Sequence, residues 1–145
     1  MSDQPRHALR VLSREECLAL LRNHLDLGRI GYVVDGVPVI VPVNFMLESD
    51  SVVFCTAKGS KLSWLSNHSR VAFQADHSHS ADESGWSVLV RGTAQEITDP
   101  AEIRLLRRGP RSWAVPSTEH WVRIVVDQIS GRWLGRGSAP AAPGP

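Results

Sequence analysis

Residues 42–62 read Pro-Val-Asn-Phe-Met-Leu-Glu-Ser-Asp-Ser-Val-Val-Phe-Cys-Thr-Ala-Lys-Gly-Ser-Lys-Leu, and this stretch decides the fold. Its two apolar runs, residues 41–47 and 51–56, are rich in branched side chains. Because the polar turn at residues 48–50 separates them, the pattern predicts a β-hairpin. This hairpin is one of several antiparallel pairs that the sequence predicts.

The end of this hairpin carries the side chains of an anion site. Thr56 closes the second strand, and Ser60 and Lys61 follow just before a short predicted helix around residues 62–66. Exposed backbone N–H groups at the start of a helix favour negative charge, and a lysine adds a charge-assisted hydrogen bond. The stretch therefore predicts a phosphate-binding loop built from Thr56, Ser60 and Lys61.

The composition is that of one ordinary globular domain. Of the 145 residues, 42% are hydrophobic and 21% are charged, which suffices for a sizeable core. A net charge of +1 gives no reason to expect nucleic acid or a membrane as a partner. The first residues lack the apolar segment of a secretory signal, so we expect a cytoplasmic protein. Cys17 and Cys55 lie within apolar patterns and are expected to be buried thiols.

Two helices are predicted by their capping signals. Ser13-Arg-Glu-Glu16 has the form of a capping box, and Gly28 stands where the C-terminal cap of this first helix is expected. The sequence Thr98-Asp-Pro100 begins a second helix that runs to about Arg108. A basic cluster at residues 104–111 suits the carboxyl end of that helix and is expected to be a solvated face.

The strands before the hairpin meet at a tight turn. Asp35-Gly36 is a strong hairpin signal between an apolar strand at residues 29–34 and a long strand at residues 37–47. Pro38 and Pro42 cannot donate ladder hydrogen bonds, so we expect the long strand at a sheet edge or at a bend.

The later strands are joined by polar segments. Residues 76–85 are expected to be a polar loop, in which His77 and His79 could form at most a weak surface metal site. The strand after this loop is expected to bend at Gly92. The predicted strands of this half are residues 70–75, 86–97, 120–126 and 128–134.

These elements favour a mainly β fold of the α+β class. About six antiparallel strands joined by short turns, with helices at the edges, are typical of a small barrel. The glycine fingerprints of the Rossmann and P-loop folds are absent from the sequence. We expect a flexible N-terminus at residues 1–11, one domain at residues 12–134, and a disordered tail rich in glycine, proline and alanine at residues 135–145.

Five motifs carry a resemblance to a known family: residues 28–32, 42–45, 56–61, 85–92 and 121–124. Through them the sequence resembles the pyridoxamine 5'-phosphate oxidase-like family of FMN-binding split-barrel proteins, and within it the nitroimidazole-reductase-like branch. The resemblance implies a six-stranded antiparallel split β-barrel of Greek-key topology with two or three peripheral helices. It also implies a homodimer with FMN in clefts between the subunits, and an oxidoreductase that passes hydride or electrons to a small acceptor.

The resemblance also implies which residues contact the cofactor, while no side chain is expected to be catalytic. The ring would lie along the strand Pro42, Val43, Asn44 and Phe45, and the phosphate on Thr56, Ser60 and Lys61. Trp86, Ser87 and Val88 match the strand at the ring end of the cleft, contributed by this subunit or by the opposite one. Many relatives carry an arginine near the phosphate where this chain has Phe54-Cys55, so Lys58 or Arg91 would have to help neutralise the phosphate.

Two alternatives stay open from the sequence. Sister families of similar fold bind a deazaflavin in place of FMN. A barrel of this kind can also be a flavin or haem carrier without enzymatic activity, or act through its dimer surface alone.

Overall fold

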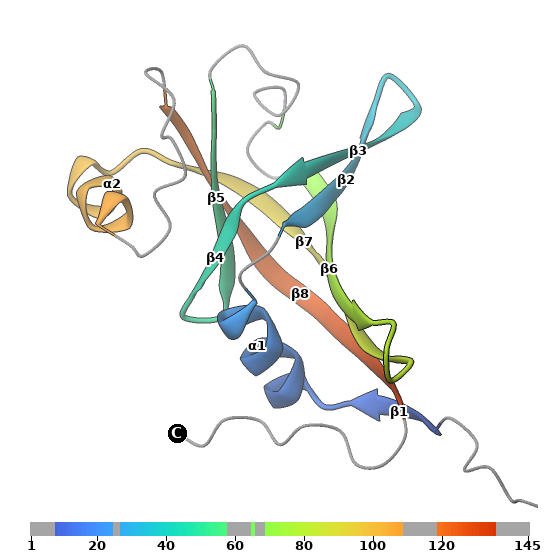
Figure 1. The fold of residues 1–145 in the computed structure, drawn as a ribbon. Coiled ribbons are helices and arrows are strands. Elements are labelled where there is room, and N and C mark those ends of the chain that lie inside the picture. Colours follow the sequence, from blue (N-terminus) through green and yellow to red (C-terminus); the bar gives the residue numbers. More distant parts are fainter. Residues whose placement is uncertain (1–7, 25–26, 58–64, 66–68, 109–118, 136–145) are drawn as a thin grey trace, which may run out of the picture.

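The computed structural model describes residues 8–24, 27–57, 65, 69–108 and 119–135, and the predicted helix around residues 62–66 lies almost wholly outside them. Within these ranges the chain forms eight strands and two helices (Figure 1). Their bounds are β1 Ala8–Leu12, α1 Arg14–Asn23, β2 Gly28–Val34, β3 Val37–Val43, β4 Phe45–Glu48, β5 Ser51–Ala57, β6 Ser69–His79, β7 Ser84–Ile97, α2 Pro100–Arg107 and β8 Glu119–Gly135.

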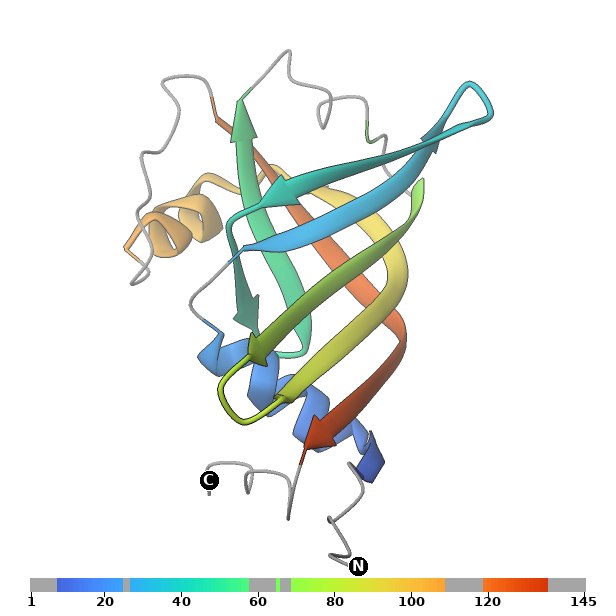
Figure 2. The same cartoon turned by 45° about the vertical axis from the view of Figure 1, so that its right-hand side comes forward.

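The strands form one antiparallel sheet that curls into a split barrel, which confirms the predicted fold class (Figure 2). The strand order is β3-β2-β6-β7-β8-β5-β4, and β1 pairs with β8. Ile30 from β2 and Phe54 from β5 come from opposite halves of this order, yet both are fully buried in the same hydrophobic core. The sheet therefore closes around that core.

The first helix begins as the sequence predicts. The Ser13 hydroxyl accepts a hydrogen bond from the backbone N–H of Glu16, and the backbone N–H of Ser13 donates to the Glu16 carboxylate. Arg10 donates a second set of hydrogen bonds to the same carboxylate, at 2.5 and 3.2 Å. These bonds, the Arg10 ones first, lower the pKa of Glu16 to about 2. The strand β1 is thereby tied to the start of α1.

Gly28 does not cap this helix, contrary to the prediction. The helix ends at His24, and Gly28 is the first residue of β2. A Cβ atom at residue 28 would lie 2.4 Å from two ring carbons of Phe73, which is fully buried. Glycine is required here because the strand passes directly over an aromatic ring, not because a helix ends.

The predicted hairpins form, with one break. Asp35 and Gly36 adopt positive φ angles of 50° and 77°, as a two-residue hairpin turn requires. The strand β3 lies at the sheet edge, as its prolines predict. The long strand expected at residues 37–47 is instead two strands, because Asn44 pairs in no ladder and the chain turns there from β3 into β4.

Polar segments proved to be more regular than the sequence suggests. The strand β6 continues to His79, so the loop expected at residues 76–85 shrinks to a turn. Residues 119–135 form one strand, and residues 8–11, expected in the flexible N-terminus, belong to β1. The hydrogen bonds between strands are made by the backbone, so a strand can form where its side chains are polar. At an exposed end of a sheet the sequence pattern therefore does not predict the strand.

The second helix packs on the outside of the barrel. Its N-cap is Asp99, whose carboxylate accepts from the backbone N–H of Ala101 at 3.0 Å, as predicted. A small separate core lies beneath α2, and Glu102 of α2 pairs with Arg123 of β8. The buried residues of that core are Val53, Ile97, Leu106 and Trp121.

Neither α1 nor α2, the helices of the described ranges, is long and apolar enough to cross a membrane.

Candidate functional site

The junction between β3 and β4 is Asn44, which is exposed and lies between two buried residues. Val43 and Phe45 are 6% and 2% exposed, whereas Pro42 and Asn44 are exposed. The Phe45 ring packs edge-to-face on Phe73 with centroids 4.7 Å apart, which fixes the junction against the core. The alternation leaves the backbone around Asn44 at the surface, as a strand that lies along a flat ligand requires.

Thr56 lies close by on β5, at the inward-facing side of the barrel. Phe45 pairs with Phe54 across the ladder, so Thr56 is two residues beyond the junction on the neighbouring strand. Thr56 is 8% exposed, and its partner across the β5–β8 ladder is His120. Ser60 and Lys61, the other predicted phosphate residues, lie outside the described residues, as does Lys58.

His120 is a residue of this region that the sequence patterns did not single out. Its Nδ1 atom lies 3.3 Å from a carboxylate oxygen of Glu96 on β7. Its Nε2 atom is buried and has no hydrogen-bond partner in the structure of the described ranges. A buried polar atom without a partner is rare in proteins and calls for an explanation. The sequence alone does not indicate this role for His120, because its position beside Thr56 depends on the register between β5 and β8.

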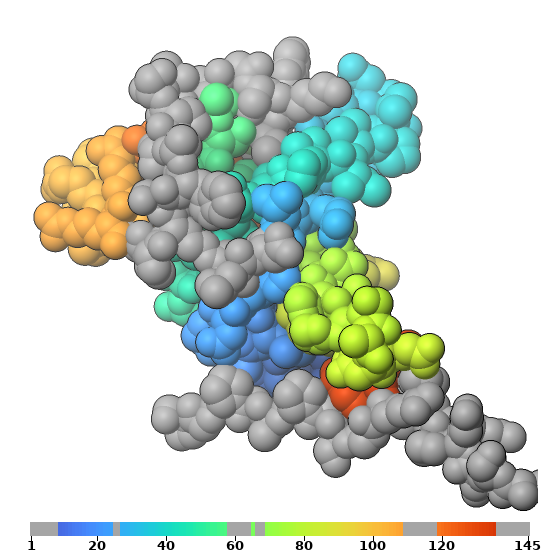
Figure 3. All heavy atoms as spheres, in the orientation of Figure 1, coloured from blue at the N-terminus to red at the C-terminus, as the bar shows by residue number. Residues whose placement is uncertain are grey.

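Trp86, Ser87 and Val88 lie near the start of β7, at the opposite end of the strand from Glu96. Val88 is fully buried in the core, while Trp86 and Ser87 line a surface hollow of about 740 Å³. Figure 3 shows the end of β6, in yellow-green, next to α1, in blue. The hollow is also lined by Leu9, His77, His79, Arg132 and Leu134.

His24, a second residue that sequence reasoning missed, connects Trp86 to Phe45. Its ring centroid lies 5.1 Å from that of Trp86 and 6.0 Å from that of Phe45. His24 is 6% exposed, and it follows Cys17 by two helical turns, on the buried side of α1. This spacing is the signal that could have identified it.

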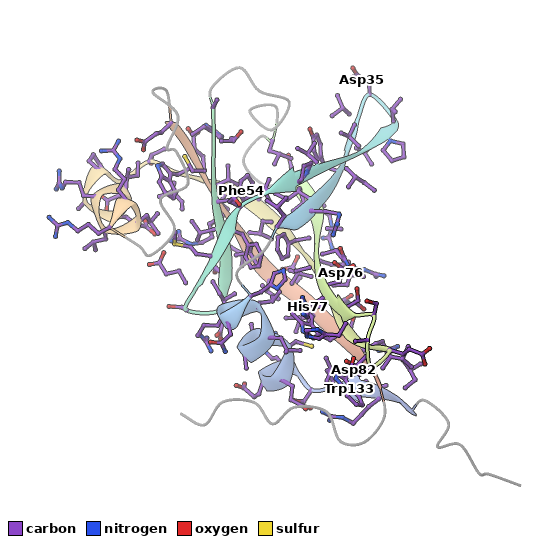
Figure 4. All side chains as sticks on the ribbon, viewed as in Figure 1. Asp35, Phe54, Asp76, His77, Asp82 and Trp133 are labelled. Carbon is purple, nitrogen blue, oxygen red and sulfur yellow. The ribbon has the colours of Figure 1, made fainter. Side chains whose placement is uncertain are left out.

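Thr56 and Trp86 are not brought together within one chain. The cross-strand partners of Thr56 and Trp86 on β8 are His120 and Trp133. The path between those partners along β8 is about 40 Å at the usual rise of a strand. In Figure 4, Trp133 lies at the lower end of the molecule and Phe54, two residues before Thr56, in its upper part. Thr56 therefore lies far along β8 from Trp86, whereas Phe45 lies near Trp86 with the His24 ring between them.

Arg91 and Cys55 are not placed to assist Thr56. Arg91 lines a different hollow, of about 430 Å³, together with Arg14 and Asp127. Cys55 alternates with Thr56 along β5 and packs against the small core beneath α2. Burial, with a smaller contribution from Glu119, raises the pKa of the Cys55 thiol to about 11. Cys17 is buried, Cys55 is half-buried, and both are free thiols.

The two histidines of the predicted loop stand on β6 and contact each other. The Nε2 atoms of His77 and His79 are 2.8 Å apart. Hydrogen bonds from Ser84 are the main cause that lowers the pKa of the adjacent Asp82. No cluster of three or more potential metal ligands occurs among the residues that the structure describes.

Comparison with known proteins identifies a family. Residues 13–133 match the family described as pyridoxamine 5'-phosphate oxidase. The chain belongs to this family. The match begins after β1 and ends within β8, so it includes all the residues that the sequence predicted for the site.

Several known proteins are similar to this chain over most of its length. The uncharacterised protein Rv0080 of Mycobacterium tuberculosis is 30% identical over 125 residues, which is 83% of this chain and 82% of that protein. The FAD binding protein from Mycobacterium smegmatis is 39% identical with a TM-score of 0.73, over 86% of this chain and 98% of that one. A Bacteroides thetaiotaomicron VPI-5482 protein named for 5-nitroimidazole antibiotic resistance has a TM-score of 0.69 over 89% of each chain, and its 19% identity shows the fold alone.

Proposed function

We propose that this chain is a cytoplasmic flavin-binding oxidoreductase that works as a homodimer, binds FMN and passes hydride or electrons to a small acceptor. The observation that carries the proposal is the junction at Asn44. There an exposed, unladdered stretch of backbone is anchored by Val43 and Phe45 and lies beside Thr56 on the next strand. A flat ring needs such a backbone edge, and a nucleotide phosphate needs donors at its end.

The donor groups near Thr56 fit the phosphate of a flavin nucleotide. The Thr56 hydroxyl and the unpartnered His120 nitrogen share one face of the sheet. The strand β5 ends at Ala57, so Ser60 and Lys61 follow directly in the sequence. Hydroxyl, imidazole and ammonium groups are good hydrogen-bond donors to phosphate oxygens. These residues would hold the phosphate, while Val43 and Asn44 would position the ring by their backbone.

The chemistry would come from the cofactor: a bound flavin supplies the hydride and electron transfer that protein side chains lack. The chain would orient the ring and exclude water from one face of it. No side chain of the described site needs to act as an acid, base or nucleophile in this proposal.

A homodimer is part of the proposal. Trp86 and Ser87 lie far along the sheet from Thr56 in one chain, although the His24 ring links Trp86 to Phe45. A second subunit could bring its own Trp86 to the ring. The site would then be complete only in the dimer.

The test is to identify the small molecule that leaves the freshly purified protein on denaturation. The proposal expects the absorbance of an oxidised flavin and the mass of FMN. If the mass is that of FAD, the cofactor is not FMN but the one named for the Mycobacterium smegmatis relative. A deazaflavin spectrum would show that the cofactor is a deazaflavin and would overturn the proposal. If sedimentation shows a monomer that still holds flavin, the dimeric site is wrong.

A turnover measurement separates the enzyme from a carrier. The proposal expects reduced nicotinamide donors to bleach the bound flavin and to support reduction of quinones or nitro compounds. A protein that keeps its flavin oxidised under these conditions is better described as a carrier.

A further inference from the structure

Among the residues that the structure describes, one buried side-chain nitrogen or oxygen atom lacks a hydrogen-bond partner. The His120 side chain is 11% exposed, and its Nε2 atom is shielded from solvent without a hydrogen-bond partner among the described residues. The other ring nitrogen, Nδ1, faces the Glu96 carboxylate at 3.3 Å. A protein seldom keeps a buried ring nitrogen unsatisfied, so this position is suited to a group that is absent from the chain itself.

The Glu96 carboxylate decides what Nε2 can bind. Because a carboxylate only accepts hydrogen bonds, Nδ1 carries the proton that faces Glu96. When a second proton is added at Nε2, that atom becomes a charged donor and the ring an imidazolium stabilised by Glu96. An acceptor oxygen with negative charge is therefore the best partner for Nε2.

The strand register places this donor beside Thr56. His120 and Thr56 are direct cross-strand partners, so their side chains leave the same face of the sheet. The residues two positions before Thr56 and after His120, Phe54 and Val122, are buried in the main core, so this face is the inner one. The hydroxyl and the imidazole therefore stand side by side at the end of β5.

We propose that His120 is a phosphate ligand of the flavin nucleotide, whose Nε2–H donates to a terminal phosphoryl oxygen while Glu96 orients the ring. This inference rests on the proposed function and adds to it the class of group recognised, a phosphate monoester. The proton at Nε2 comes from solvent, and no covalent bond changes.

The charged groups around His120 are few in the described structure. The carboxylate of Glu96 on β7 faces the His120 ring, and the neutral side chain of Thr56 on β5 lies beside that ring. Glu119 points to the other face of β8, where it accepts hydrogen bonds from Arg107 and Trp121.

Calorimetry on the full-length chain, freed of copurified flavin, provides the test. FMN and riboflavin are each titrated into the wild type, into His120→Leu and into the control Leu105→Ala, a neutral change at an exposed residue of α2. The wild type is expected to bind FMN more tightly than riboflavin. His120→Leu is expected to bind FMN about 10-fold or more weakly than the wild type does, as for a lost hydrogen bond to a charged group. Its affinity for riboflavin, and both affinities of Leu105→Ala, are expected to stay unchanged.

Other results overturn the inference. If His120→Leu binds FMN like the wild type, or loses FMN and riboflavin equally, then His120 is not a phosphate ligand. If that variant does not fold, the wild type alone decides, because equal affinity for FMN and riboflavin contradicts the proposal. A wild type that binds riboflavin and FMN equally well retains the proposed flavin function and refutes the role of His120. A wild type that binds no flavin refutes both.

Discussion

Replacing Gly28 by alanine should destabilise the barrel, whereas the same change at Gly31 on the same strand should not. The added Cβ at residue 28 would lie 2.4 Å from two ring carbons of Phe73 and 3.1 Å from Phe45. Carbon atoms pack best at about 3.5–4.0 Å, so the Phe73 ring would have to move by more than about 1 Å. That ring is fully buried and packed edge-to-face on Phe45, which leaves it no free volume.

The expected cost follows from overpacked cores. Such insertions typically cost about 1–3 kcal/mol. For a chain of this length we expect the melting temperature of Gly28→Ala to fall by roughly 3–12 °C. In Gly31→Ala the nearest atoms lie 3.8 Å away or more, an ordinary contact. Since alanine restricts the unfolded chain more than glycine, this control should gain about 0.4–1 kcal/mol.

Urea unfolding followed by tryptophan fluorescence measures both variants under identical conditions. The expected difference between them is about 1.5–4 kcal/mol, the sum of the two effects. If Gly28→Ala is as stable as Gly31→Ala, then the passage of β2 over the Phe73 ring is not what makes glycine necessary. Because Phe45 contacts the same ring, a displaced Phe73 should also lower the affinity for flavin.

Three further results are expected. The pKa of Glu16 is about 2, below its ordinary 4.5, so the contribution of its carboxylate to stability is present above pH 4.5 and is lost as the pH falls toward 2. In urea unfolding, the stability difference between the wild type and Glu16→Gln should therefore vanish over that pH range. A difference that stays constant with pH would contradict the role of Arg10. Lys61→Ala should weaken FMN binding by an amount that shrinks at high salt, and unchanged affinity in calorimetry would refute the phosphate loop. In the flavin-free protein His120→Leu should raise stability by about 1 kcal/mol, because an unsatisfied buried nitrogen is removed; a loss in urea unfolding would mean that the pair with Glu96 matters more.

The elements that the sequence predicted well are those with local signals. The capping box at Ser13 and Glu16, the Asp35-Gly36 turn and the N-cap at Asp99 depend on residues a few positions apart, and all three are confirmed. At Gly92, where a bend was expected, the β7–β8 ladder shifts its register, and a Cβ there would lie 2.1 Å from the carbonyl oxygen of Val125. Local sterics and hydrogen bonding suffice to specify such features.

The elements that the sequence did not predict depend on distant partners. The strand β1 exists because residues 8–12 pair with residues 131–135, and nothing near Ala8 indicates this. Asn44 interrupts a continuous apolar run because the barrel must turn there. His120 and His24 acquire their surroundings from other strands, so their place in the candidate site is visible only in the register and the packing.

The strand β8 makes completion of the barrel a late event in synthesis. Residues 119–135 pair with β1, β5 and β7, so the first and middle parts of the sheet wait for the same segment. Contacts between residues so far apart in the chain form slowly, and a growing polypeptide cannot complete them before β8 has left the ribosome. Until then the inner faces of β5 and β7, which carry Val52, Phe54, Val88 and Val90, stay accessible to chaperones and to one another.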